Sequence, residues 1–528
     1  MNMNMNKLNY ENADAELTVT VDFGNIISDT TQFGNGIGFC LSFPTDSDIH
    51  FAGERRLTML DLVRDYNIAT LRWPMGTASQ AYLWNTMDNN GQFRYPIKSG
   101  VSTLSRSPAD FSFKPVDRNG IYTGGDMDFD EFLGLCKQTG AVPVICLPFC
   151  TDLYADSLIT LEDLYKTIRE QVRYAAKEKG MSGMYWEVGN EIELELRKNL
   201  SEDPAEGVAW YIERYNVIYE IIKAEDPAAK AGPGVYLFYE GTQGYRNWGE
   251  PIINALRDRM DFVVNHMYGS PQKYWNQHKM TYAEFRSLGN DSPIYHNRVL
   301  VQILDALGEP YRSRIEIIVT EFSGHRDRGW EVRGNNMQTA LLNSVMIADM
   351  LAEPRITQAH FWLTRSPWGD SLKNTDMNNA HTALHWDGTP TAMGMSVLSA
   401  ARHMTGKLAG TVSSDPIINA YTSVNDTAGA ATVLMINRDL EPVRVRVILN
   451  NNSIAATAAA VYVFKAMNGS PYDYDYRYIK TAPAAIENNT FEAVLPPISA
   501  TFAEIGTSGR NLPEIPAGST ANPPPPLL

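Results

Sequence analysis

The chain has few cysteines, no long hydrophobic run and a deficit of positive charge, and each shortage excludes a class of protein. Its 528 residues include only four cysteines, too few for a disulfide framework in a chain of this size. No run of 18 apolar residues is present, so we expect no membrane-spanning helix. The net charge is −16, which argues against nucleic acid or an anionic membrane as a partner, because both are bound through basic patches.

The cysteines and acidic residues also lack the patterns of metal sites. Cys40, Cys146 and Cys150 lie in apolar, strand-like segments, where a free cysteine behaves as a small hydrophobic residue. Cys146 and Cys150 lack the spacing and the histidine partners of a zinc site. The acidic stretch 126–131 lacks the central glycine of a calcium loop and is expected to cap a helix. We therefore expect that neither a metal ion nor an organic cofactor takes part in the chemistry, while a structural calcium ion stays open.

The two ends of the chain carry little information about location. Residues Met1–Lys7 lack the apolar core of a secretion signal. Two expectations stay open: a cytoplasmic protein, or a secreted protein whose signal has been removed. Residues 509–528 contain four consecutive prolines, which predicts a stiff linker or an appended tail. The oligomeric state is not indicated.

From about residue 33 to residue 405, short β-branched runs alternate with longer helical patterns, as repeated βα units require. The candidate strands are Gly36–Phe43, Ile68–Pro74, Val142–Phe149, Met184–Glu191, Lys230–Val235, Asp261–Tyr268, Ile315–Phe322 and Thr357–Thr364. Eight strands are the number that a closed (β/α)8 TIM barrel requires. The sequence therefore predicts an α/β catalytic barrel over residues 33–405.

Residues 406–508 have a different sequence pattern from the barrel. Short strands separated by Asn, Gly, Asp and Pro predict an all-β sandwich, with candidates Ala430–Asn437, Val443–Leu449, Ala459–Phe464 and Thr490–Leu495. One further alternating segment, Leu17–Phe23, precedes the barrel. Because a closed barrel cannot accept an extra strand, we predict that residues 1–32 contribute this strand to the sandwich.

Two of the barrel strands end on a glutamate, Glu191 after Tyr185–Asn190 and Glu321 after Ile315–Thr320. Carboxylates are poor strand residues, so something other than packing must hold them there. Chemistry in a parallel barrel sits at the carboxyl ends of the strands, and two carboxylates are the minimum equipment for glycosidic bond hydrolysis. Apolar neighbours such as Trp186 would raise the pKa of Glu191 for a general acid, whereas Glu321 would be the ionised nucleophile.

Polar residues near the same strand ends are candidates for positioning and substrate binding. Asn190 can hydrogen-bond a sugar hydroxyl. Arg72 and Tyr268 are well placed to keep Glu321 ionised, although Arg72 fits a structural ion pair of the barrel as well. His266 and Tyr268 alternate along one strand and so share a face; a buried core histidine is the alternative for His266.

Other residues near the strand ends are weaker candidates. Tryptophans gather there, and indole rings stack on the apolar faces of sugars. Trp362 and Trp73 are the candidates for substrate binding, and Trp84, Trp330 and Trp368 lie in or near such loops too. Glu187 and Glu193 are weaker rivals to Glu191, because one lies mid-strand and the other past the strand end.

Four segments together resemble the clan A retaining glycoside hydrolases: Leu71–Pro74, Trp186–Glu191, Asn265–Tyr268 and Val319–Phe322. The likeness is strongest to family 51, the α-L-arabinofuranosidase family that also contains endoglucanases. It covers roughly residues 33–405. The resemblance implies a barrel with a β-sandwich, with Glu191 as acid/base and Glu321 as nucleophile.

Two departures from the family pattern bear on the substrate. Arabinofuranosidases of family 51 typically have Arg-Tyr-Pro-Gly-Gly-Asn where this chain has Arg-Trp-Pro-Met-Gly-Thr at 72–77. Their first strand usually carries a glutamate that holds the arabinose, whereas residues 36–38 are Gly-Ile-Gly. A site without such polar groups discriminates less well between arabinose and other sugars. We therefore predict a retaining, endo-acting β-glycanase acting on a plant or algal polysaccharide. The alternatives are an exo-acting α-L-arabinofuranosidase and a non-catalytic carbohydrate-binding barrel, which would not need both glutamates.

Overall fold

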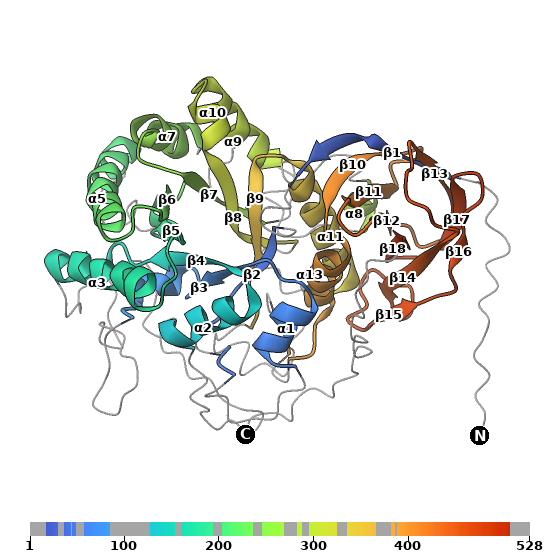
Figure 1. The fold of residues 1–528 in the computed structure, drawn as a ribbon, viewed down its shortest axis with the longest axis horizontal. Coiled ribbons are helices and arrows are strands. Elements are labelled where there is room, and N and C mark those ends of the chain that lie inside the picture. Colours follow the sequence, from blue (N-terminus) through green and yellow to red (C-terminus); the bar gives the residue numbers. More distant parts are fainter. Residues whose placement is uncertain are drawn as a thin grey trace.

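The computed structural model describes residues 17–29, 36–43, 45–48, 57–84, 127–153, 160–193, 203–235, 245–268, 282–287, 295–324, 335–365, 382–385 and 388–506. These residues form two sheets, a parallel sheet of eight strands and a mixed sheet of ten. The parallel sheet and its helices occupy one side of the molecule, and the mixed sheet occupies the other (Figure 1).

The parallel sheet is the predicted barrel. Its strands are β2 (Ile37–Cys40), β3 (Thr70–Trp73), β4 (Val142–Leu147), β5 (Tyr185–Val188), β6 (Lys230–Pro233), β7 (Phe262–Tyr268), β8 (Glu316–Ser323) and β9 (Ile356–Phe361). Their order is β6-β5-β4-β3-β2-β9-β8-β7, and a parallel bridge between Gly234 and Val264 joins β6 to β7. Each predicted barrel strand overlaps an observed one, so the barrel prediction is confirmed.

The inside of the barrel changes character along its axis. An apolar cluster is formed by Val144, Tyr185, Phe262, Val264 and Ile318. The next inward-facing positions, nearer the carboxyl ends of the strands, carry buried charged and polar residues such as Arg72, Glu187 and His266. Charged groups inside a barrel need partners, so this polar layer identifies the end of the barrel where a site can form.

Helices surround the barrel. They are α1 (Met59–Asp65), α2 (Phe129–Thr139), α3 (Leu161–Arg173), α5 (Pro204–Glu225), α7 (Glu250–Leu256), α8 (Tyr282–Ser287), α9 (Tyr295–Ala306), α10 (Tyr311–Arg314), α11 (Met337–Ala352) and α13 (Ala392–His403). Local signals set their ends: Asp128 caps α2 by accepting from the Glu131 N–H at 2.7 Å, and Gly140 ends it with a φ of 78°. No helix in the described part of the chain is long and apolar enough to cross a membrane.

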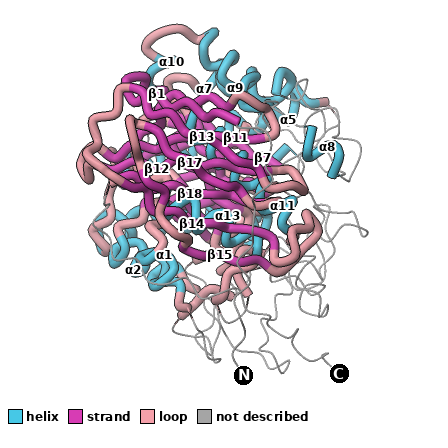
Figure 2. The backbone as a smooth tube through the Cα atoms, turned by 90° about the vertical axis from the view of Figure 1, so that its right-hand side faces the viewer, coloured by secondary structure: helices cyan, strands magenta, loops and turns pink. Residues whose placement is uncertain are grey.

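The mixed sheet contains β1 (Leu17–Ser28), β10 (Lys407–Ser413), β11 (Ile418–Asn425), β12 (Ala430–Asn437), β13 (Val443–Asn450), β14 (Ala458–Ala466), β15 (Tyr476–Lys480), β16 (Ala484–Ala485), β17 (Thr490–Leu495) and β18 (Ser499–Ile505). Figure 2 shows its strands facing the viewer. Strand β1 pairs antiparallel with β10 and parallel with β13. The prediction that an N-terminal strand joins the C-terminal sandwich is therefore confirmed. The exact domain boundaries stay predictions.

Two buried helices connect the barrel to the sandwich. Helices α11 and α13 are buried along almost their whole length, and α11 contacts β1, β12 and β18. Polar pairs cross the same boundary: Tyr421 donates to Asp349 at 2.6 Å, and His403 Nδ1 lies 2.7 Å from Glu504 Oε1. The sandwich thus packs against the helices that follow β8 and β9, and the first residues of α11 donate backbone hydrogen bonds to Asp473 and Pro471 of the sandwich.

Candidate active site

A strained turn at the end of β5 carries Glu191. Gly189 has a φ of +83°, and a Cβ there would lie 2.6 Å from Ile192 Cγ1, so only glycine fits. Glu191 itself has a φ of +45°, a backbone conformation that costs energy for a residue with a side chain. Such strain gathers at functional sites. The turn brings the Glu191 carboxylate to within 3.0 Å of His266 Nδ1.

A β-bulge in β8 carries Glu321. Along the β7–β8 pair, Asn265 is opposite Val319 and the next residue, His266, is opposite Glu321, so Thr320 is the extra residue. A bulge re-aims the side chains that follow it. Thr320 and Glu321 therefore both contact residues inside the barrel, although strict alternation would turn one of them outward.

The Arg72 guanidinium connects the groups of the polar layer. It donates from Nε and Nη2 to the two oxygens of Glu187 at 2.6 and 2.8 Å, and from Nη2 to Asn190 Oδ1 at 2.7 Å. Its Nη1 donates to Glu321 Oε1 at 2.8 Å and to Cys40 Sγ at 3.4 Å. The expected contact with Glu321 and the alternative ion pair are thus both present. Because Arg72 is fully buried and its donors are engaged, we correct its assignment from substrate binding to positioning.

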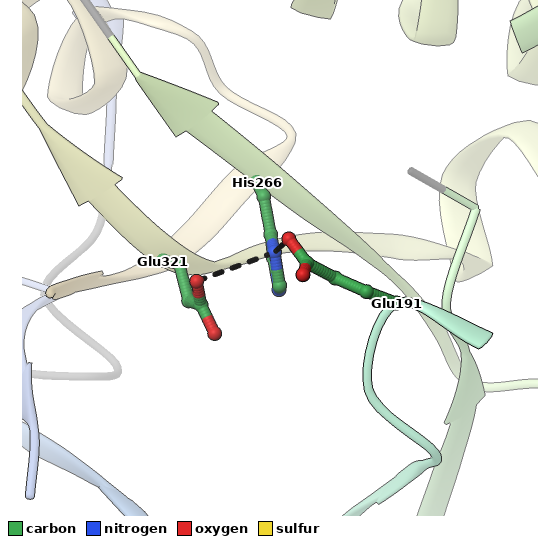
Figure 3. Close-up of side chains that lie close together, drawn as sticks. All are labelled: Glu191, His266 and Glu321. Atoms are coloured by element: carbon green, nitrogen blue, oxygen red, sulfur yellow. Dashed lines mark hydrogen bonds and ion pairs between the residues drawn. The ribbon is translucent and has the colours of Figure 1, made fainter. Parts of the chain in front are cut away.

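His266 lies between the two glutamates (Figure 3). Its Nδ1 is 3.0 Å from Glu191 Oε1 and 3.5 Å from Glu321 Oε2, and its Nε2 is 3.1 Å from Thr320 Oγ1. Both ring nitrogens therefore contact protein groups, and a contact of His266 with a sugar stays a prediction. Tyr268 donates to Glu321 Oε2 at 2.5 Å, the contact expected from the sequence.

The cluster contains more carboxylates than permanent cations. Three carboxylates, those of Glu187, Glu191 and Glu321, lie near one permanent cation, Arg72. Burial raises the pKa of Glu321, against the opposing effect of His266 and Arg72. Burial lowers the pKa of His266, but the charges of Glu321 and Glu191 and the hydrogen bond to Glu191 outweigh it, and the net shift is upward. The imidazole therefore holds its proton more tightly than a free histidine does.

Glu191, His266 and Glu321 form the one set in the described part of the chain that resembles a metal site. One ligand-type atom from each of them lies within 4.8 Å of the other two. Arg72 and the histidine already supply positive charge at these carboxylates. The expectation of no metal and no cofactor stays a prediction.

Asn190 has one engaged and one available polar group. Its Oδ1 accepts from Arg72, while its buried Nδ2 has no hydrogen-bond partner within the described residues. A buried donor left without a partner is costly. Such a donor suits the contact with a substrate hydroxyl expected for Asn190, which stays a prediction.

Among the candidate tryptophans that the structure describes, Trp362 borders the cluster. Trp362 is 9% exposed, and a Cβ on Gly76 would lie 2.4 Å from Glu321 Oε1 and 2.8 Å from the Trp362 ring. Trp73 is a correction: it is fully buried and stacks on Phe132 with ring centroids 5.6 Å apart. Because Arg72 points into the barrel, the next residue of the strand points outward to the helices.

Trp84 lies away from the cluster. Trp84 packs against Phe129 and Tyr174 on the helical layer, and its Nε1 donates to Thr167 O at 3.1 Å. The expectation for Trp330 and Trp368 falls outside the described residues.

Sequence reasoning missed several residues of the cluster. Glu187 was ranked only as a weak rival to Glu191, yet it is the fully buried partner of Arg72. Its signal was a carboxylate inside an apolar strand, which requires a cation on a neighbouring element. Gln80 was not noticed; its Oε1 accepts from the Phe149 N–H at 2.8 Å, and its Nε2 donates to Asn190 O at 3.4 Å. Thr320 and Gly76 carried no signal of their own.

No protein-family model matches the chain, and a search among curated proteins finds no match. Solved structures do match. An α-L-arabinofuranosidase from Thermotoga maritima, in complex with arabinose, is 15% identical with a TM-score of 0.65, covering 93% of this chain and 100% of that one. The family 51 arabinofuranosidase from Xanthomonas axonopodis pv. citri (13%, TM-score 0.63) and a family 44 xyloglucanase from Paenibacillus polymyxa (13%, TM-score 0.58) match with the same coverage of both chains. This chain therefore has the fold of clan A glycoside hydrolases, most like family 51, as its motifs indicated.

Proposed function

We propose that this protein is a retaining O-glycoside hydrolase in which Glu191 is the acid/base and Glu321 is the nucleophile. The observation that carries the proposal is the approach of the two carboxylates at the carboxyl ends of β5 and β8, where oxygens of both, together with His266 Nδ1, lie within 4.8 Å of one another. Retaining enzymes hold the two carboxyl groups about 5–5.5 Å apart, whereas inverting enzymes leave about 6.5–9.5 Å for a water molecule. The observed approach favours retention.

The surrounding residues suit the two steps of a double displacement. Glu321 would attack the anomeric carbon while Glu191 protonates the departing oxygen; water, deprotonated by Glu191, would then release the sugar from Glu321. Arg72 and Tyr268 fix the two oxygens of Glu321 through separate hydrogen bonds, so the nucleophile is aimed before substrate arrives. Asn190 offers its Nδ2 donor to a hydroxyl of the bound sugar.

For the substrate, we propose an endo-acting β-glycanase on a plant or algal polysaccharide. Gly38 in β2 leaves no room for a sugar-binding side chain, since a Cβ there would lie 1.9 Å from Thr70 O. The nearby carboxylate of Asp46 is fully buried and accepts from Arg365 at 2.6 Å and from the Ser42 N–H at 2.7 Å. Neither position supplies the arabinose-binding carboxylate of family 51.

The second candidate is an exo-acting α-L-arabinofuranosidase. The observation that favours it is the fold: the arabinofuranosidases matched above have higher TM-scores than the xyloglucanase. A third candidate, a non-catalytic carbohydrate-binding barrel, would not explain why two carboxylates and a histidine are held together at an energetic cost.

Product analysis on a panel of polysaccharides and aryl glycosides tests these candidates. We expect a rapid fall in the viscosity of a β-glycan, release of oligosaccharides, and a first product with the anomeric configuration of the substrate by NMR. Release of arabinose alone from chain ends would favour the second candidate. Binding without cleavage of any member of the panel would favour the third, and a product of inverted configuration would contradict the double displacement.

Gly76 provides a geometric test of the same site. We expect Gly76→Ala to lower kcat by about 100-fold, because the added methyl group displaces the Glu321 carboxylate and small displacements of a reacting group cost about that much. Steady-state kinetics and near-UV circular dichroism would measure activity and fold. Gly134→Ala is the matched control, since its Cβ would meet only Gln138 Nε2, at 4.0 Å. Wild-type kcat in the Gly76 variant would contradict this placement of the nucleophile.

A further inference from the structure

A chain of hydrogen bonds runs from the acid/base into the barrel. It passes from Glu191 Oε1 to His266 Nδ1 (3.0 Å), from His266 Nε2 to Thr320 Oγ1 (3.1 Å), and from Thr320 Oγ1 to Glu187 Oε1 (3.3 Å). Only its first member borders the expected position of the substrate. The other members reach Glu191 only through the histidine.

The direction of each bond follows from the buried end of the chain. Glu187 is fully buried and both of its oxygens accept hydrogen bonds from Arg72, so it meets Thr320 as an acceptor. The single hydroxyl proton of Thr320 therefore points to Glu187. The oxygen of Thr320 is then left as an acceptor toward the ring, and His266 Nε2 must carry a proton.

We propose that Thr320 is a positioning residue whose hydroxyl keeps one imidazole proton on Nε2 of His266, so that Nδ1 is the ring atom that exchanges the catalytic proton with Glu191. This inference rests on the proposed function of Glu191. It adds a residue that does not touch substrate, and it gives His266 the role of a proton store.

The other groups around the ring agree with this arrangement. On the Nδ1 side lie Glu191, with Glu321 at 3.5 Å and Arg72 beyond it, paired to Glu321. On the Nε2 side lie Thr320 and Glu187. Tyr268, two residues further along β7, donates to Glu321 rather than to the ring. Two carboxylates thus face Nδ1, so a proton between Nδ1 and Glu191 is strongly favoured over a bare lone pair there.

The proton balance of the reaction is complete with these groups. The proton moves from Nδ1 to Glu191, and from Glu191 to the glycosidic oxygen as the bond from that oxygen to the anomeric carbon breaks and Glu321 forms its bond to the carbon. Glu191 and the ring are then left one proton short. In the second step Glu191 takes a proton from the attacking water, whose oxygen replaces Glu321 on the carbon, and the pair returns to its starting state.

The proposal predicts a change in pH dependence. Without the Thr320 hydroxyl, the neutral ring can place its proton on Nδ1 and donate to ionised Glu191, so the state lacking the catalytic proton is stabilised. The proton is then lost at lower pH. For Thr320→Val we expect the basic limb of kcat/KM to move toward acid by about 0.5–1 pH unit, the size of one ordinary hydrogen bond. Thr320→Ser keeps the hydroxyl and should keep the wild-type limb.

The measurement uses full-length variants and a glycoside with a poor leaving group, for which acid catalysis matters most. A lower kcat/KM in Thr320→Val with an unmoved basic limb would mean a merely structural role and would overturn the proposal. Equal shifts in the Val and Ser variants would overturn it as well, because the hydroxyl could not then be the cause.

A second readout does not depend on activity. In protein labelled with ¹⁵N-histidine, the ring nitrogen shifts of His266, identified by their loss in His266→Gln, report the tautomer of the neutral ring. We expect the Nε2–H form in the wild type and a gain of the Nδ1–H form in Thr320→Val. An Nδ1–H ring in the wild type would overturn the proposal. If the enzyme cleaved no glycoside, the proposed function would fail, while the tautomer would still decide the role of Thr320.

Discussion

Glu321→Ala is expected to abolish hydrolysis of every glycoside, with a loss on the order of 10⁵-fold or more, because it removes the carboxylate proposed to form the glycosyl-enzyme bond. Glu191→Ala is expected to fail differently. It removes the proton donor, so glycosides with sugar leaving groups should slow by about 10²–10⁴-fold, whereas activated aryl glycosides should still form the intermediate. Steady-state and burst kinetics on both substrate types separate the two roles.

Rescue by small anions also distinguishes the acid/base variant from the nucleophile variant. In Glu191→Ala, azide can enter the space left by the carboxylate and attack the accumulated intermediate, so turnover of an activated substrate should recover, with a glycosyl azide of retained configuration as product. Glu162→Ala, at an exposed position on α3, is the matched control and should behave as the wild type. Azide rescue at Glu321 with an inverted product would mean that the two roles are reversed. Unchanged hydrolysis in both variants would remove the catalytic assignment altogether.

Arg72→Leu is expected to be the most destabilising single change in the site. It leaves Glu187 buried without its partner and removes a donor from Glu321. Breaking a buried ion pair by removing one member costs about 3–5 kcal/mol, so we expect the free energy of unfolding to fall by that amount. Urea denaturation followed by tryptophan fluorescence would measure it. Activity should fall too, because both Glu321 and Asn190 lose the group that orients them.

A double variant separates stability from catalysis at this position. Arg72→Leu combined with Glu187→Met replaces the whole pair by apolar side chains, and such replacements are often neutral or stabilising. We expect most of the lost stability to return while activity stays low, since Glu321 still lacks its donor. Recovery of activity together with stability would mean that Arg72 serves the fold alone.

The strand ends show how much of the fold and of the site could be predicted from the sequence. The apolar runs that end on Glu191 and Glu321 predicted two strands of the barrel. They also marked the two glutamates as site residues, because a charged residue at the end of a buried strand conflicts with local preference. The alternating segment Leu17–Phe23 likewise predicted a strand outside the barrel, since its period of two belongs to a sheet with one exposed face. These inferences depend only on local pattern.

Residues whose role comes from long-range contacts were missed or misassigned. Trp73 was expected at the mouth of the barrel because tryptophan suits sugars, but its neighbour Arg72 occupies the inward direction. Glu187 was ranked low because its partner lies 115 positions away in the sequence. Strand β18 was not predicted because its Ser and Ala residues, which are not β-branched, interrupt the Thr, Phe and Ile residues that favour a strand.

What the sequence by itself determined is the order of the strands and helices and the chemical groups at the strand ends, since these follow from periodicity and residue type. What only the tertiary structure decided is which groups meet. The bulge at Thr320 turns Glu321 into the barrel, and the left-handed backbone at Glu191 brings the second carboxylate to His266. Both are departures from regular geometry that neighbouring strands enforce, and local preference would oppose each of them.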